Sequence, residues 1–127
     1  MILLLLALLQ QPHDPFLGRW EGTSTCIKAA WNAACHDEVV RYDVERAAGD
    51  SVTLHAFKRL GAEWDPMGDI TFAYDSTGHR WVGEFANARI HVAWRFAVNA
   101  NALTGDVVVF PDLRKARDVV AHRVPPQ

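Results

Sequence analysis

The stretch LGRWEGTSTC, residues 17–26, decides the fold. It follows an entry segment that contains Pro12 and Pro15, and a polar, threonine-rich run leads from its tryptophan to a cysteine. Threonine and aromatic residues favour the pleated, extended backbone. The sequence therefore predicts that the folded domain begins with the first strand of a small β-barrel.

Further segments of alternating hydrophobicity follow, separated by turn residues, as is typical of an all-β protein. Together with the first segment, the predicted strands cover residues 19–26, 38–46, 51–58, 69–75, 79–85, 89–98, 102–110 and 117–124. The connections are too short for parallel crossovers, so successive strands must pair antiparallel. Eight strands can close into a barrel, which removes the two exposed edges of an open sheet. We therefore expect an eight-stranded antiparallel up-and-down β-barrel.

An apolar leader precedes this domain. Eight consecutive apolar residues run from Ile2 to Leu9, within a leader that we place at residues 1–11. This length suits a secretory signal and falls short of the roughly 20 residues that span a bilayer. No Lys or Arg precedes the run, and no small-x-small cleavage site follows it. We expect a secreted or periplasmic protein with one domain over residues 12–127; the alternative is that the apolar run is a buried segment of the fold.

Charge and cysteine content narrow the function. The formal net charge of −2 is too small to indicate a nucleic-acid partner or an anionic membrane surface. Cys26 and Cys35 are the only cysteines. In an exported chain such a pair favours a disulfide that closes a short loop, with free thiols as the alternative.

The predicted connections differ in length between the two ends of the barrel. In a meander, successive connections alternate between the ends, so the tight ones share one end: 47–50, 75–78 and 99–101. The longer ones share the other end: 27–37, 59–68 and 111–116. Long loops at one mouth usually carry binding residues. Trp31, Trp64 and Met67 lie in these loops, where they either border a pocket or plug the end of the barrel.

Strand alternation predicts which side chains face the barrel interior. Tyr42 and Trp94 belong to inward-facing apolar sets, and the same parity turns Glu38 and Lys58 inward near the end with the long loops. A buried charge must be paired or functional. Glu38 and Lys58 either pair with each other across adjacent strands or orient a polar group of a ligand. A β-bulge would reverse these assignments.

Gly18-Arg19-Trp20, at the start of the first strand, resembles the Gly-x-Trp signature of the lipocalins and the wider calycin superfamily. In that family the tryptophan closes the base of the barrel and is covered by an arginine from the last strand, a position that Arg123 takes here. The resemblance implies a structural Trp20–Arg123 contact, worth about 0.5–2 kcal/mol. The second family motif, a Thr-Asp-Tyr-like sequence, is missing, and avidin-like barrels of similar length are an alternative.

The sequence shows no motif for catalysis, and we predict no catalytic residue, metal or cofactor. The six histidines form no His-x-His or His-x₃-His pair, and neighbouring residues such as Cys35 and His36 point to opposite faces of a strand. We expect a carrier of a small apolar or amphipathic molecule, bound by Trp31, Glu38, Tyr42, Lys58, Trp64, Met67 and Trp94. The alternative is a barrel filled by its aromatic side chains that contacts a protein or envelope component through its surface. A third hypothesis is an enzyme or metal carrier that uses His36 and Glu38.

Overall fold

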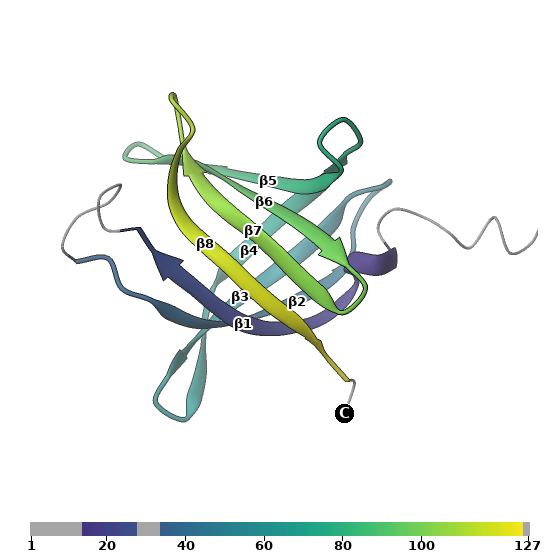
Figure 1. Cartoon of the computed structure of the whole chain (residues 1–127), viewed down its shortest axis with the longest axis horizontal. Coiled ribbons are helices and arrows are strands. Elements are labelled where there is room, and N and C mark those ends of the chain that lie inside the picture. Colours follow the sequence, from purple (N-terminus) through teal and green to yellow (C-terminus); the bar gives the residue numbers. More distant parts are fainter. Residues whose placement is uncertain (1–13, 28–33, 126–127) are drawn as a thin grey trace, which may run out of the picture.

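A computed structural model describes residues 14–27 and 34–125, which fold into eight strands preceded by one turn of 3-10 helix. The elements are η1 (Asp14–Phe16), β1 (Gly18–Cys26), β2 (Glu38–Arg46), β3 (Val52–Leu60), β4 (Glu63–Asp75), β5 (Arg80–Ala86), β6 (His91–Asn99), β7 (Ala102–Val109) and β8 (Arg114–Val124). Each strand pairs antiparallel with the next, and β8 returns to pair with β1 (Figure 1). The predicted eight-stranded barrel is confirmed. The predicted leader and Trp31 lie outside the described residues.

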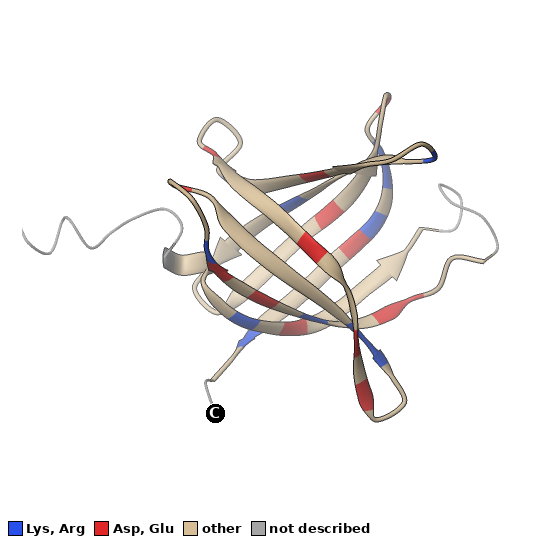
Figure 2. Cartoon of the chain, turned by 180° about the vertical axis from the view of Figure 1, so that it is seen from behind, with Lys and Arg blue, Asp and Glu red and all other residues tan. Residues whose placement is uncertain are grey.

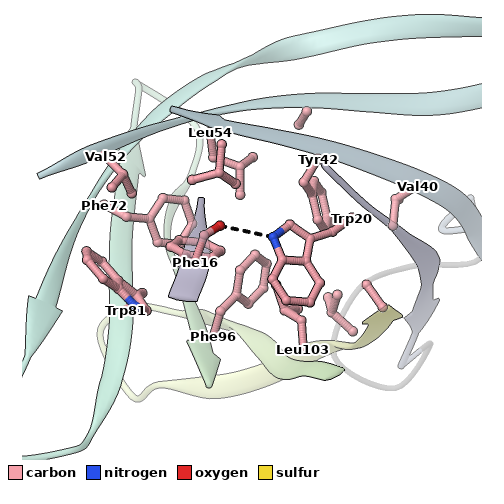
Figure 3. Packing of buried hydrophobic residues seen from close by; sticks show 14 of the residues in the cluster. Phe16, Trp20, Val40, Tyr42, Val52, Leu54, Phe72, Trp81, Phe96 and Leu103 are labelled. Atoms are coloured by element: carbon pink, nitrogen blue, oxygen red, sulfur yellow. Dashed lines mark hydrogen bonds between the residues drawn. The ribbon is translucent and has the colours of Figure 1, made fainter. Parts of the chain in front are cut away.

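One end of the barrel is closed by η1 and the start of β1 (Figure 1). The Trp20 indole Nε1 donates a hydrogen bond to the Phe16 carbonyl oxygen at 3.0 Å, which fixes η1 across this end (Figure 3). The Arg123 guanidinium carbon lies 4.4 Å from the centre of the Trp20 ring, in the arrangement that the Gly-x-Trp resemblance implied. Arg123 also donates hydrogen bonds to the carbonyl oxygens of Leu17 and Pro15. We call this the closed end.

Position 18 of this motif is glycine for a steric reason. Gly18 has a φ of +116°, and a Cβ there would lie 3.2 Å from Arg123 Nη1. Any larger residue would be strained in its backbone and would crowd the guanidinium over Trp20. The Gly-x-Trp signature therefore reflects a contact among Gly18, Trp20 and Arg123, which joins the first strand to the last.

An aromatic cluster fills the half of the barrel next to the closed end (Figure 3). Phe16 is fully buried, and its ring centre lies 5.2 Å from that of Trp81 and 5.7 Å from that of Phe72. Phe96 stacks on Phe72 with ring centres 5.4 Å apart. Aromatic pairs at these separations add to the stabilisation from burial. This half of the barrel is a packed core.

The prediction of a loop over residues 59–68 is wrong. These residues form the ends of β3 and β4, joined by the two residues Gly61 and Ala62, and the hairpin projects beyond the body of the barrel (Figure 1). Pro66 interrupts no ladder because β4 pairs with β5 only over Phe72–Asp75, so the preceding part of β4 is an edge strand that tolerates proline. A β-bulge accommodates the extra residue, since Ala56 is opposite Gly68 whereas Phe57 is opposite Pro66.

The predicted long loop over residues 111–116 is also shorter than expected. β7 ends at Val109 and β8 begins at Arg114, so a four-residue connection joins them. Of the three connections predicted to be long, only the one between β1 and β2 has that length. The end of the barrel that carries the β1–β2, β3–β4, β5–β6 and β7–β8 connections is called the open end below. None of the helical segments within residues 14–27 and 34–125 has the length and hydropathy needed to cross a bilayer.

We expect Phe16→Ala to lower the free energy of unfolding by about 3–5 kcal/mol, because it removes a fully buried ring from the aromatic cluster. Phe85→Ala is the matched control: this ring is 45% exposed, and its loss should cost about 1 kcal/mol. Urea unfolding followed by far-ultraviolet circular dichroism measures both. Equal losses for the two variants would contradict the assignment of η1 to the core.

Candidate functional site

A cavity of about 320 Å³ occupies the half of the barrel next to the open end. Its walls are mostly apolar and come from every strand of the barrel. The lining residues are Ser24, Glu38, Val40, Tyr42, Leu54, Ala56, Met67, Gly68, Asp69, Ile70, Phe85, Ile90, Val92, Trp94, Val107 and Arg117. The lining mixes small residues such as Ala56 and Gly68 with the rings of Tyr42, Phe85 and Trp94, whereas rings packed against one another fill the closed half. The barrel is therefore half filled and half hollow.

The cavity reaches the surface between β4 and β5. Met67 on β4 and Phe85 on β5 both line it, and they are 41% and 45% exposed. These two strands pair with each other only over Phe72–Asp75, so they separate toward the open end. The separation leaves an apolar entrance in the barrel wall.

His55 on β3 holds β4 in place next to this entrance. His55 Nδ1 lies 2.7 Å from Asp69 Oδ1, and His55 Nε2 lies 3.0 Å from Glu45 Oε1. The hydrogen bonds to Glu45 and Asp69 raise the pKa of His55 above its ordinary value. Asp69 also lines the cavity, so His55 ties the outer face of the sheet to the cavity wall.

Charged side chains meet at the opposite wall, formed by β1, β2 and β8. Arg117 Nη1 lies 3.5 Å from Glu38 Oε1, and Lys58 Nζ lies 4.0 Å from Glu38 Oε2. Arg117 Nη1 also donates hydrogen bonds to the carbonyl oxygen and the hydroxyl of Ser24, which is buried. Its Nη2 donates to the His36 carbonyl oxygen at 3.0 Å. The charge of Glu38 is thus balanced within the wall, as a partly buried carboxylate requires.

Tyr42 adds a polar group to this wall. Its side chain is almost fully buried, and the ring lies 5.5 Å from that of Phe96. Burial raises the pKa of Tyr42, and the nearby charge of Glu38 contributes in the same direction. The hydroxyl therefore stays protonated at neutral pH.

A larger hollow of about 740 Å³ lies on the outer surface beside the closed end. Its charged groups already pair with one another: Arg19 Nε lies 2.8 Å from Asp43 Oδ1, and Glu45 pairs with His55. Such pairs leave little for a ligand to recognise. We therefore take the cavity inside the barrel as the candidate site, although it is the smaller of the two.

The structure brings four of the predicted site residues together: Glu38, Tyr42, Met67 and Trp94 line the cavity. Lys58 stands beside them as the partner of Glu38. Whether these residues bind a ligand stays a prediction.

Trp64 lies elsewhere, on the outer face, where the guanidinium groups of Arg41 and Arg59 lie 5.5 and 5.2 Å from its ring. The bulge at Met67 is the reason, because it reverses the alternation of β4 and places Trp64 opposite the outward-facing Arg59. Trp31 falls outside the described residues.

Sequence reasoning missed Arg117 and Ser24. For Arg117 a signal existed: it lies two and four residues before Val119 and Ala121, which both face the interior. Nothing in the sequence distinguishes Ser24 from its threonine neighbours. Within the described residues, no group of three or more His, Cys, Asp or Glu side chains is arranged to hold a metal ion.

The predicted disulfide is confirmed: Cys26, at the end of β1, is bonded to Cys35. It joins the chain on both sides of the β1–β2 connection at the open end, and Arg117 Nη2 lies 3.5 Å from the Cys35 sulfur. The disulfide indicates an oxidising compartment outside the cytoplasm.

Fold and cavity together define a closed, eight-stranded up-and-down β-barrel that is packed at one end and hollow at the other. No protein-family model matches the chain, and no curated protein matches it.

We expect the stabilisation contributed by His55 to depend on pH. Because the folded-state pKa of His55 is raised, this stabilisation is fully present below the unfolded pKa of about 6.5 and is lost as the pH rises through the folded-state value. When the pH rises from 6 to 9, the urea midpoint of the wild type should therefore decrease by more than that of His55→Gln. His122→Gln, an exposed histidine on β8, serves as the control and should follow the wild type. Parallel curves for all three proteins would contradict the Glu45–His55–Asp69 contact.

Proposed function

We propose that the protein is a secreted or periplasmic, lipocalin-like carrier that binds a small apolar or amphipathic molecule in the open half of its barrel. The single observation that carries this proposal is the cavity of about 320 Å³ with its largely apolar lining. Ligand sites in proteins are mostly apolar hollows of about 300–1,000 Å³ with a few polar groups that orient the ligand. This cavity lies at the lower end of that range.

The division of the barrel into two halves supports binding over a purely structural role. The aromatic cluster around Phe16 and Phe96 supplies the core, and the cavity contributes no such packing. An empty hollow lowers stability, since its walls lose contacts that close packing would provide. A barrel that served only as an interaction module would gain nothing from this loss of stability.

The entrance supports an apolar ligand. Met67 and Phe85 are large hydrophobic side chains that remain exposed next to the cavity. Methionine adapts its shape to irregular partners, and an exposed apolar border is typical of a ligand entrance. The export of the carrier is supported by the apolar run of residues 2–9 and by the disulfide.

A cavity-filling variant tests the proposal. Ala56 is buried, lines the cavity and pairs across the sheet with Tyr42, so Ala56→Phe should fill the hollow with its ring. We expect it to weaken binding of an uncharged apolar probe such as N-phenyl-1-naphthylamine at least about tenfold, a change of about 1.4 kcal/mol. Probe fluorescence measures the affinity, and circular dichroism checks the fold.

Ala97→Phe is the matched control, because Ala97 is exposed on β6 and lies outside the cavity lining. This variant should bind the probe as the wild type does. Equal binding by both variants, or no binding by the wild type to this probe and to a panel of fatty acids, isoprenoids and haem, would overturn the proposal.

A further inference from the structure

The Tyr42 hydroxyl has unused hydrogen-bonding capacity. The residue is 4% exposed and lines the cavity, yet no group of residues 14–27 or 34–125 forms a hydrogen bond with this hydroxyl. A tyrosine hydroxyl donates one hydrogen bond and accepts others. The hydroxyl borders the cavity with its hydrogen-bonding capacity unfilled by the protein, which makes this group a candidate for contact with a ligand.

Glu38 provides a second unused group on the same wall. It precedes Tyr42 by four residues on β2, so both side chains project from the same face of the strand. Its carboxylate oxygens lie 3.5 Å from Arg117 Nη1 and 4.0 Å from Lys58 Nζ, which is longer than a normal hydrogen bond. Among the described residues, none donates a hydrogen bond to the Glu38 carboxylate. Arg117 and Lys58 offset the charge of this carboxylate, which can still accept a hydrogen bond from a ligand.

The terminal nitrogens of Arg117 donate their hydrogen bonds within the protein. Its two terminal nitrogens donate to Ser24, to the His36 carbonyl oxygen and to the Cys35 sulfur. It therefore supplies positive charge next to Glu38 without presenting a free pair of donors to an anionic ligand, which is how arginine usually binds a carboxylate. Arg117 acts as a positioning residue for Glu38.

Tyr42, Glu38, Arg117 and Lys58 discriminate between possible polar ends of a ligand. Because Arg117 and Lys58 already offset Glu38, their attractions and repulsions on an added charge of either sign largely cancel, and an ionised end would lose its hydration without a free counter-charge to replace it. A hydrocarbon would leave both Tyr42 and Glu38 without hydrogen-bond partners. A neutral hydroxyl satisfies both groups, because it can donate to a carboxylate and accept from a phenol.

Resting on the proposed carrier function, we infer that the cavity selects an apolar alcohol or phenol. Its O–H group donates a hydrogen bond to the Glu38 carboxylate and accepts one from the Tyr42 hydroxyl. The apolar body lies against Leu54, Ile70 and Val92, with Met67 and Phe85 at the entrance. The volume is about twice that of an apolar cavity that holds benzene, so it suits a body of about eight to twelve carbon atoms.

Four octyl compounds that differ only at one end test this inference: octan-1-ol, octane, octanoate and octylamine. Isothermal titration calorimetry at pH 7.5 with the full-length protein should give octan-1-ol an affinity at least about tenfold higher than that of each other compound, because hydrogen bonds to charged groups contribute this much or more. Octane, octanoate or octylamine binding as tightly as octan-1-ol would overturn the inference and leave the carrier function standing. Binding of none of the four would overturn the inference, whereas the carrier function is tested separately by the fluorescent probe and the ligand panel.

Removing the Tyr42 hydroxyl is the decisive variant. Tyr42→Phe keeps the ring against Phe96 and breaks no hydrogen bond among the described residues, so the fold should be retained. We expect about a three- to tenfold loss of octan-1-ol affinity, the usual range for a neutral hydrogen bond, and no change for octane. Tyr74→Phe is the control, since Tyr74 packs against Trp81 at the closed end and should change neither affinity. An unchanged ratio of octan-1-ol to octane affinity in Tyr42→Phe would overturn the inference.

Glu38→Gln tests the charge balance. The amide still accepts a hydrogen bond but no longer offsets the charges of Arg117 and Lys58. Octanoate should therefore gain at least about tenfold in affinity relative to octan-1-ol, because Arg117 and Lys58 then lack the anion that offsets their charge. An unchanged octanoate to octan-1-ol ratio would contradict the role assigned to Glu38.

Discussion

The contact of Arg123 with Trp20 is the constraint on which the rest of the barrel depends. It joins the last strand to the first at the point where the sheet must close, and Gly18 leaves the space that the guanidinium needs. The Trp20 indole in turn holds the Phe16 carbonyl, so one set of contacts both closes the cylinder and anchors η1 across its end. Cation–π contacts gain strength when the cation is partly desolvated, as it is here.

Closing one end with aromatic residues determines what the other end can be. The rings of Phe16, Phe72 and Phe96 occupy the closed half, and the lining of the open half includes small residues such as Ala56 and Gly68. An eight-stranded barrel has an interior just wide enough for its side chains to fill, so small residues at these positions leave space that the rings of Tyr42, Phe85 and Trp94 do not fill. The hollow lowers stability, and a ligand that occupies it would stabilise the folded protein.

Charged residues are spread over the strands of the barrel (Figure 2), and their surroundings differ. On the outer face they form partly exposed pairs such as Arg19–Asp43, which contribute modestly to stability. Glu38 and Arg117 instead lie at the wall of the cavity, where desolvation makes each charge costly without its partner. Because Glu38 and Arg117 offset each other's charge, they can orient a polar group of a ligand without giving the cavity wall a large net charge.

The sequence by itself determined the eight strands and the closed barrel and favoured the disulfide, because alternation, turn residues and cysteine spacing act over neighbouring positions. The Trp20–Arg123 contact was implied by the resemblance of Gly18-Arg19-Trp20 to the Gly-x-Trp signature. It also brought Glu38, Tyr42 and Met67 forward as candidates. Only the tertiary structure decided that residues 59–68 are a hairpin, that Trp64 faces outward and that Arg117 stands at the cavity wall. A β-bulge is a mismatch of two residues against one across two strands, so it depends on the pairing partner and leaves no reliable mark in one strand alone.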